Sequence, residues 1–277
     1  MAEKAKRFLI IGAHPDDADI RCGGSAIKWA KAGHIVKFVS MCNGDCGHYS
    51  MDREALRDRR YLETQASKNI AGLYEYQVFH DNHDCELEPS VELRKKVITL
   101  IREFNPDVVL SHRLCDYHAD HRATAQLVQD AAYLTQVPLF CPDAPVPQVN
   151  PVFGCVFDAF TDPRPFRHDA AIIIDDVMDG KCRMLDCHVS QFYEWLAYEH
   201  SGGKEIIDPA RLTWEEKKEH LLKHWGKRYI DAANDAREAL SAMYGTEGKT
   251  AQYAESYELS PYGRKVSLEE FRELIKP

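Results

Sequence analysis

Short apolar runs alternate with amphipathic segments along the first half of the chain. The apolar runs contain β-branched residues and have the length of buried strands, at 7–12, 34–41, 76–79 and 107–111. Segments with helical periodicity lie between and after them, at 23–32, 53–73, 90–104 and 121–134. Gly33, Gly72 and Pro106 stand where three of these helices are expected to end.

This alternation predicts an α/β fold, a Rossmann-like and mostly parallel sheet with helices on both faces. In such sheets, binding and catalytic groups gather where strands end and helices begin. A proline-rich stretch at 138–151 is expected to form an extended loop. Beyond it, the pattern predicts two further strands and a helix, at 152–160, 170–175 and 177–198.

The composition changes near residue 200, where charged residues become more frequent. We therefore predict a catalytic domain over residues 1–200 and a mainly helical C-terminal extension over residues 201–277. Two capping-box sequences, Thr213-Trp-Glu-Glu216 and Ser267-Leu-Glu-Glu270, predict the starts of a long charged helix and a short final one. Residues 244–265 are predicted to be irregular.

The long helix of the extension carries an apolar stripe that must pack on something. We expect it to pack on the catalytic domain, with the alternative that it joins two copies of the chain in a homo-oligomer. The residues of the stripe are Leu221, Leu222, Trp225, Tyr229 and Ile230.

Charge and hydropathy exclude several classes of protein. The chain has 35 Lys and Arg against 44 Asp and Glu, a formal net charge of −9. An acidic chain is repelled by nucleic-acid phosphates and by anionic lipids, so neither partner is expected. No run of about 18 apolar residues could span a bilayer. The first apolar run, 8–13, is too short for the core of a signal peptide, so we expect a cytoplasmic protein.

The nine cysteines do not predict a disulfide framework, because their number is odd and no Cys-x-x-Cys pair occurs. Cys42 and Cys46 leave a cysteine-based zinc site open as an alternative. The simpler interpretation is a set of reduced, partly buried thiols.

A dense group of metal-binding and proton-binding side chains follows the first predicted strand. His14, Asp16 and Asp17 fall within four residues, and Gly23-Gly24 follows them. An imidazole and a carboxylate are common zinc ligands, and a further carboxylate can act as the base toward a metal-bound water. A strand-to-helix turn would need only one Asp as an N-cap, so the pattern favours a metal site.

A second group follows the fourth predicted strand, and it contains His112, Asp116, His118, Asp120 and His121. Since both groups follow strands of one wound sheet, we expect them to meet in space. His121 would supply a third metal ligand and His118 would face the substrate. Asp120 is expected to raise the pKa of His118 and to keep it charged. The alternative is a surface loop with solvated histidines.

A nucleotide-binding turn is excluded by the same residues. The turn after the first strand lacks Gly-x-Gly-x-x-Gly, and two carboxylates there would repel a pyrophosphate. Neither a phosphate-binding Gly-x-x-x-x-Gly-Lys motif nor a Gly-x-Ser-x-Gly elbow occurs.

The segments Ala13-His-Pro-Asp-Asp17 and His118-Ala-Asp-His121 together resemble the LmbE-like or PIG-L family of zinc-dependent N-acetylglucosaminyl deacetylases. The resemblance covers about residues 6–195. Softer matches are Arg60-x-x-Glu63 and His188-x-Ser190-Gln191 on later segments, and Ala119 departs from the Pro of many members. No part of the chain after residue 200 matches a segment of known chemistry.

The resemblance implies a role for each matching residue. His14, Asp17 and His121 would bind zinc, and Asp16 would be the general base. His118 would stabilise the oxyanion with the support of Asp120. Arg60 would contact the sugar.

The resemblance therefore predicts a zinc-dependent amide hydrolase that removes the N-acetyl group from an N-acetylglucosamine-type sugar or glycoconjugate. Two His and one Asp bind several divalent ions, which leaves iron(II) as an alternative to zinc. Another zinc amidase, acting on a thiol conjugate or a non-sugar amide, would use the same residues. A third candidate from another class is a metal-binding or glycan-binding module without catalysis.

Overall fold

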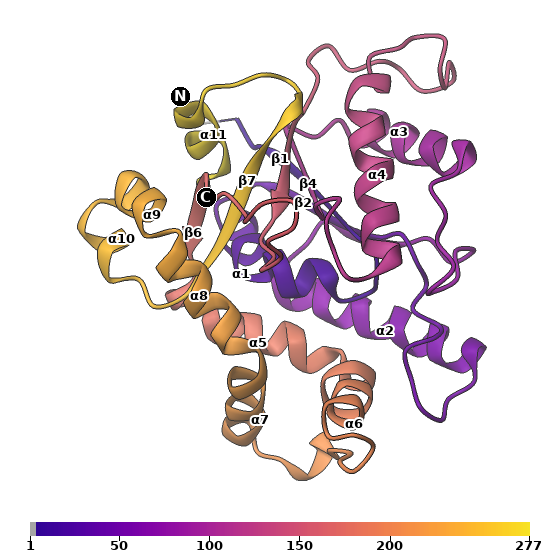
Figure 1. The fold of residues 1–277 in the computed structure, drawn as a ribbon, viewed down its shortest axis with the longest axis vertical. Coiled ribbons are helices and arrows are strands. Elements are labelled where there is room, and N and C mark those ends of the chain that lie inside the picture. The colour runs from indigo at the N-terminus through magenta and orange to yellow at the C-terminus, as the bar shows by residue number, and fades with distance from the viewer. Residues whose placement is uncertain (1–3) are drawn as a thin grey trace.

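The computed structural model describes residues 4–277, and a seven-stranded sheet lies at its centre (Figure 1). The strand order is β3-β2-β1-β4-β5-β7-β6. The first five strands of this order are parallel, and β7 runs antiparallel to both of its neighbours. The strands are β1 (Arg7–Gly12), β2 (Ile35–Ser40), β3 (Glu75–Val78), β4 (Val108–Ser111), β5 (Val152–Val156), β6 (Ala170–Ile173) and β7 (Ala254–Gly263).

Helices cover both faces of the sheet, which confirms the predicted fold class. The helices that connect the strands are α1 (Asp17–Lys31), α2 (Arg53–Ala71), α3 (Val91–Phe104) and α4 (Ala119–Leu134). After β6 come α5 (Met178–Cys187), the π-helical η2 (Ser190–Trp195) and α6 (Leu196–His200). The extension adds α7 (Trp214–Leu221), the π-helical η4 (Leu222–Gly226), α8 (Lys227–Asp235), α9 (Arg237–Tyr244), α10 (Thr246–Thr250) and α11 (Leu268–Ile275). Within residues 4–277, no helix combines the length and the apolar character needed to cross a lipid bilayer.

The apolar run of β1 is continuous because this strand is buried on both faces. Phe8 and Ile10 belong to the core between the sheet and α1, α5 and α8. Leu9 and Ile11 belong to a second core under α3 and α4. Successive side chains of a strand point to opposite faces, so a two-sided sheet needs apolar residues at every position.

The strand order reverses between β1 and β4. From β1 the chain moves outward to β2 and β3, and it then returns to place β4 on the other side of β1. This is a topological switch point, where a crevice opens beyond the carboxyl ends of the strands. The two predicted histidine and aspartate groups follow these two strands, so the fold itself brings them together.

Helix α1 begins at Asp17, six residues before the predicted start, and Gly23 and Gly24 lie inside it. The two glycines serve close packing and do not mark a helix start. A Cβ at Gly24 would lie 2.7 Å from Cγ2 of Ile174, and one at Gly23 would lie 3.2 Å from Sδ of Met184. Helix α1 can therefore approach its neighbours only with glycine at these positions.

The prediction that residues 244–265 are irregular was wrong, because β7 lies within them and is inserted between β5 and β6. Its polar residues obscured the strand pattern, since Glu255, Ser256 and Glu258 are all buried. The rest of the extension is mainly helical, as predicted. The boundary near residue 200 stays a prediction, and the place of β7 in the sheet argues against independent folding of the two parts.

One buried carboxylate joins the extension to the catalytic part. Glu255 on β7 accepts hydrogen bonds from the backbone N–H groups of Gly24 and Ser25 in α1, at 3.0 and 2.7 Å. It also forms an ion pair with Lys181 of α5, and both side chains are almost fully buried. Tyr229 of α8 donates a hydrogen bond to the carbonyl of Ile20 at 3.1 Å. The apolar stripe around Tyr229 thus packs on its own sheet and α1.

Replacing Glu255 with alanine would leave the Lys181 ammonium buried without a counter-charge. Removing one partner of a buried ion pair typically costs about 3–5 kcal/mol, so the free energy of unfolding of Glu255→Ala should fall by that amount. Urea denaturation measures it. The control is Glu269→Ala on the exposed start of α11, where a change within about 0.5 kcal/mol is expected. Equal stability of the two variants would contradict this role.

Candidate metal and catalytic site

Three predicted ligands converge beyond β1 and β4. His14 Nδ1 lies 3.2 Å from His121 Nε2 and 3.4 Å from an oxygen of Asp17. His121 Nε2 lies 3.4 Å from the other oxygen of Asp17. All three side chains are largely buried. Two imidazole nitrogens and one carboxylate therefore face one point, which is the arrangement that a divalent metal ion needs.

Further carboxylates hold the outer nitrogens of these imidazoles. His14 Nε2 lies 2.8 Å from Asp84 and 3.1 Å from Asp120, and His121 Nδ1 lies 3.1 Å from Asp116. Carboxylates in this position fix the ring orientation of metal-binding histidines and increase their basicity. The donor set and its outer partners thus fit a divalent ion such as zinc.

The charges of the site favour an ionised Asp17. Burial raises the pKa of Asp17, but the neighbouring His121 and His112 hold it well below its usual value. Although burial lowers the pKa of His14, hydrogen bonding to Asp120, Asp17 and Asp84 raises it well above the usual value. Asp17 is therefore ionised, as a metal ligand would need to be, and His14 lies among carboxylates that attract a cation.

Asp16 occupies the N-cap position of α1, beside the three converging side chains. Its carboxylate is buried and lies 3.0 Å from Nη2 of Arg60. Burial raises the pKa of Asp16, while the Arg60 guanidinium opposes this shift. A raised pKa suits a carboxylate that must accept a proton and later release it.

Arg60 itself lies beneath the site, with only 2% of its surface exposed. Besides Asp16, it contacts Asp84 at 3.7 Å and the carbonyl of Gly44 at 3.4 Å. Gly44 has a φ of +77°, and a Cβ there would lie 2.8 Å from the Arg60 side chain. These contacts position Arg60 against Asp16, whereas the resemblance implied a contact with the sugar.

His118 lies at the edge of the site, with its ring 4.6 Å from that of His14. Its Nδ1 accepts the backbone N–H of Asp120 at 3.2 Å, which leaves Nε2 to carry the proton. The nearest Asp120 oxygen lies 3.9 Å from His118 Nδ1, which is too far for a hydrogen bond but close enough for its charge to act on the ring. Burial and the neighbouring His14 and His121 lower the pKa of His118, while the Asp120 carboxylate raises it.

The Asp120 carboxylate is engaged elsewhere. It accepts the N–H groups of Cys85 at 2.7 Å and Leu87 at 3.2 Å, in addition to its contact with His14. Asp120 therefore holds the loop after β3 against the site and orients His14. His118 and Asp120 lie two residues apart at the start of α4, so their side chains point in different directions.

The segment that includes His188, Ser190 and Gln191 also lies near the site. The buried Glu63 of α2 accepts the N–H of Ser190 at 2.9 Å and its hydroxyl at 2.6 Å. His188 Nε2 lies 3.3 Å from the buried Asp19 of α1. These contacts join α1, α2 and η2, so the segment supports the walls around Asp16 and Arg60.

Two residues contribute to the site without having received a role from the sequence. His112 stacks on His121 at 4.2 Å, and its Nε2 lies 3.4 Å from Asp17. Burial and the nearby His121 lower the pKa of His112 to about 4. Asp84 contacts His14 from the loop after β3. The sequence could have indicated Asp84 by its position after β3, because the carboxyl end of this strand lies at the same edge of the sheet as those of β1 and β4.

Positive charge gathers on the side of the site that faces the extension. Arg21 lies one helical turn after Asp17 and donates to the carbonyl of Phe157. Arg228 of α8 comes close enough for Arg21 to lower the Arg228 pKa to about 10, together with burial. Within residues 4–277, neither arginine forms an ion pair with a carboxylate. This side of the site is thus suited to a negatively charged group.

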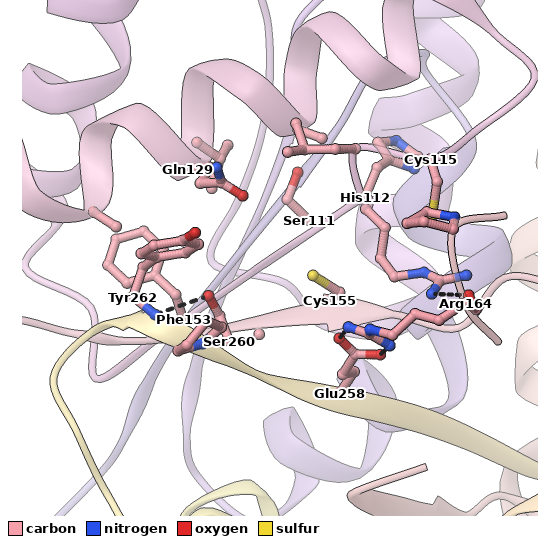
Figure 2. Close-up of a pocket in the computed structure, with 18 residues that line it drawn as sticks. Ser111, His112, Cys115, Gln129, Phe153, Cys155, Arg164, Glu258, Ser260 and Tyr262 are labelled. Carbon is pink, nitrogen blue, oxygen red and sulfur yellow. Dashed lines mark hydrogen bonds and ion pairs between the residues drawn. The ribbon is translucent and has the colours of Figure 1, made fainter. Parts of the chain in front are cut away.

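A cavity of about 270 Å³ lies between α4 and the strands β4, β5 and β7 (Figure 2). His112 stands in its wall with Ser111, and the ion pair of Arg164 and Glu258 lines it as well. None of the three converging ligands is among its described lining residues. The cavity therefore begins beside His112 and is separate from the predicted metal site.

Comparisons with known proteins agree with the fold. The family model for PIG-L, described as GlcNAc-PI de-N-acetylase, matches residues 9–132. A diacetylchitobiose deacetylase from Thermococcus kodakarensis is 30% identical over 203 residues, which make up 70% of this chain and 74% of that protein. A 4-oxalmesaconate hydratase from Pseudomonas putida is 26% identical over 205 residues, which make up 70% of this chain and 77% of that protein.

Among solved structures, GalB, the 4-carboxy-2-hydroxymuconate hydratase from Pseudomonas putida KT2440, is similar with a TM-score of 0.69 and 20% identity. The similarity covers 95% of this chain and 98% of that one, so the shared fold includes the extension. Fold and site together define an α/β protein with a histidine and carboxylate centre at its topological switch point. The chain belongs to the PIG-L (LmbE-like) family, which confirms the resemblance.

Proposed function

We propose that this enzyme is a metal-dependent N-deacetylase that releases acetate from an N-acetylglucosamine-type sugar or glycoconjugate. The observation that carries the proposal is the convergence of His14, Asp17 and His121 with Asp16 alongside. The relative named diacetylchitobiose deacetylase and the family described as GlcNAc-PI de-N-acetylase support the substrate class. Zinc is the proposed ion, with iron(II) as the alternative.

A divalent ion held by His14, Asp17 and His121 would polarise the amide carbonyl and make water acidic enough to react at neutral pH. Asp16 takes the proton of the attacking water, because its buried carboxylate adjoins the ligands and its pKa is raised. Arg60 holds this carboxylate in place from below. The acetyl group leaves as acetate, and Asp16 delivers the proton to the departing amine.

His118 stabilises the negative charge that develops on the carbonyl oxygen. Its Nδ1 is occupied by the backbone N–H of Asp120, so Nε2–H is the group that can donate a hydrogen bond. The side chain is 24% exposed, which allows the substrate to reach it.

Acetate release from a panel of compounds tests the proposal. The panel contains N-acetylglucosamine, neutral glycosides, GlcNAc 1-phosphate, carboxylated glycosides, chitin oligomers, simple N-acetyl amines and N-acyl thiol conjugates. Each compound is incubated with protein that has been loaded with one equivalent of zinc per chain. Release from the sugars that depends on Asp16 supports the deacetylase. Cleavage of only the non-sugar amides would favour the alternative amidase, and sugar binding without turnover would favour the binding module.

The hydratase relative defines a second candidate reaction, the addition of water to an unsaturated carboxylic acid. The unpaired Arg21 and Arg228 beside the site favour a carboxylate-bearing substrate. We therefore add an unsaturated dicarboxylate to the panel, and its hydration is followed by the loss of ultraviolet absorbance. Hydration of this compound without acetate release from any other would contradict the deacetylase.

The assignment of the ligands predicts opposite metal contents for two variants. His121→Ala removes one of three ligands and should lose bound zinc, as measured by atomic absorption after gel filtration. Asp16→Ala should retain one zinc per chain and lose acetate release. A zinc-free Asp16→Ala protein would mean that the roles of Asp16 and Asp17 are exchanged.

The proposed oxyanion contact predicts the effect of His118→Ala. Loss of one such donor typically lowers kcat by about 10²–10³-fold, while the metal remains bound. Steady-state kinetics on the best substrate of the panel measures this loss. An unchanged kcat would remove His118 from the mechanism.

The contacts of Arg60 predict that it positions Asp16. Arg60→Lys keeps the charge but loses the planar fork that reaches Asp16 and Asp84, so kcat should fall about 10²-fold with little change in KM. The matched control is Arg59→Lys, one residue earlier, whose guanidinium pairs with Glu194 instead. A large increase in KM at unchanged kcat would instead support the sugar contact that the resemblance implied.

A further inference from the structure

Two exposed cysteines lie side by side at the rim of the site. Cys46 belongs to the loop after β2 and Cys85 to the loop after β3. The N–H of Asp84 donates to Asp45 at 3.0 Å, which holds the two loops together next to both cysteines. Burial raises the pKa of the Cys85 thiol, and the neighbouring Asp84 and Cys46 raise it further. Neither thiol has a part in the proposed deacetylation.

The backbone directs Cys85 toward the histidines. Its N–H donates to the Asp120 carboxylate at 2.7 Å, and its φ is +69°. Between residues 4 and 277, only Asn105 and Cys141 share this property among the residues other than glycine. Cys85 is therefore held in an uncommon conformation directly beside Asp120 and His118.

Cys85, His118 and Asp120 form a group of metal-binding side chains. One ligand atom of each, the Cys85 sulfur, a ring nitrogen of His118 and a carboxylate oxygen of Asp120, lies within 4.8 Å of the other two. None of the three belongs to the set of His14, Asp17 and His121. Thiolate, imidazole and carboxylate are the ligands that zinc takes in proteins. Cys46 is a neighbour of Cys85 on the adjoining loop.

We propose that Cys85, His118 and Asp120, with Cys46 beside them, form a second site for a thiophilic divalent ion such as Zn²⁺, and that its occupation inhibits the enzyme. We call these four residues the rim cluster. The inhibition rests on the proposed function, because an ion in the rim cluster takes the imidazole of His118 away from the oxyanion. The binding of the second ion does not depend on any substrate.

The second site must be weaker than the first. The ligands of the first site are buried and oriented by Asp84, Asp116 and Asp120. In the rim cluster the thiols are exposed, and the Asp120 carboxylate already contacts His14 and two backbone N–H groups. Zinc should therefore activate the enzyme at one equivalent per chain and inhibit it at higher concentration.

Metal titration of the whole, reduced protein tests this site. Apoprotein prepared with a chelator is titrated with Co²⁺ in the absence of oxygen, because a cobalt–thiolate bond produces a charge-transfer absorption band in the near ultraviolet. We expect two ions per chain, with the thiolate band growing only during the second equivalent. Equilibrium dialysis with Zn²⁺ gives the stoichiometry independently.

Cys85→Ser is the decisive variant, and Cys187→Ser on α5 is its matched control. Cys85→Ser should bind the first ion normally, lack the thiolate band, and need about 10–100-fold more zinc for the second ion and for inhibition. Cys46→Ser should weaken the second ion less, because Cys46 is the outermost ligand. Cys187→Ser should behave like the wild type.

Binding of a single ion by the wild type would overturn the proposal, as would a thiolate band during the first equivalent or an unchanged band in Cys85→Ser. These readouts do not need turnover. If two ions bind and depend on Cys85 while no N-acetyl compound is cleaved, the rim cluster stands and the proposed function fails. If acetate is released but only one ion binds, the function stands and the rim cluster fails.

Discussion

The parallel pairing of β1 with β4 is the constraint on which the rest of the site depends. Ile11 is in register with Ser111, so the two strands end at the same level. The turn that carries His14, Asp16 and Asp17 and the loop that carries His118 and His121 therefore start side by side. Both cores hold this pair of strands, one through Phe8 and Ile10 and the other through Leu9 and Ile11. A strand pair buried on both faces thus positions the polar groups of the site.

The buried carboxylates of the site need positive charge nearby, and this need indicates a metal ion. Asp17, Asp84 and Asp120 all surround His14, and burying so many carboxylates is costly without a compensating positive charge. Arg60 supplies part of that charge from below. A divalent ion between the ligands would supply the rest, and it would oppose the effects of burial and of the Asp17 charge, which both raise the pKa of Asp16. Side chains that can bind a metal ion continue outward to Cys85, which is exposed and is therefore not destabilised by burial in the same way.

The sequence predicted the parallel strands and the two histidine and aspartate groups because both signals are local. Continuous apolar runs indicate strands buried on both faces, and the chemistry follows directly after them. Strand β7 was missed because Glu255 and Glu258 break the apolar pattern, and each has a buried partner far away in the sequence. The contacts of Asp84 with His14 and of Arg60 with Asp16 were also missed, because each joins residues that are far apart in the sequence. The direction of the Asp120 side chain depends on the loop after β3, which no local pattern places beside α4.

The central claim of this account is that His14, Asp17 and His121 hold one catalytic ion without sulfur. A competing group shares His14, since His14, Cys42 and Asp120 also lie close enough to bind one ion. X-ray absorption spectroscopy of the protein loaded with one equivalent of zinc separates the two. We expect only nitrogen and oxygen neighbours at about 2.0–2.2 Å, with the outer-shell scattering of two imidazoles. A sulfur neighbour at about 2.3 Å, or the scattering of a single imidazole, would contradict the assignment.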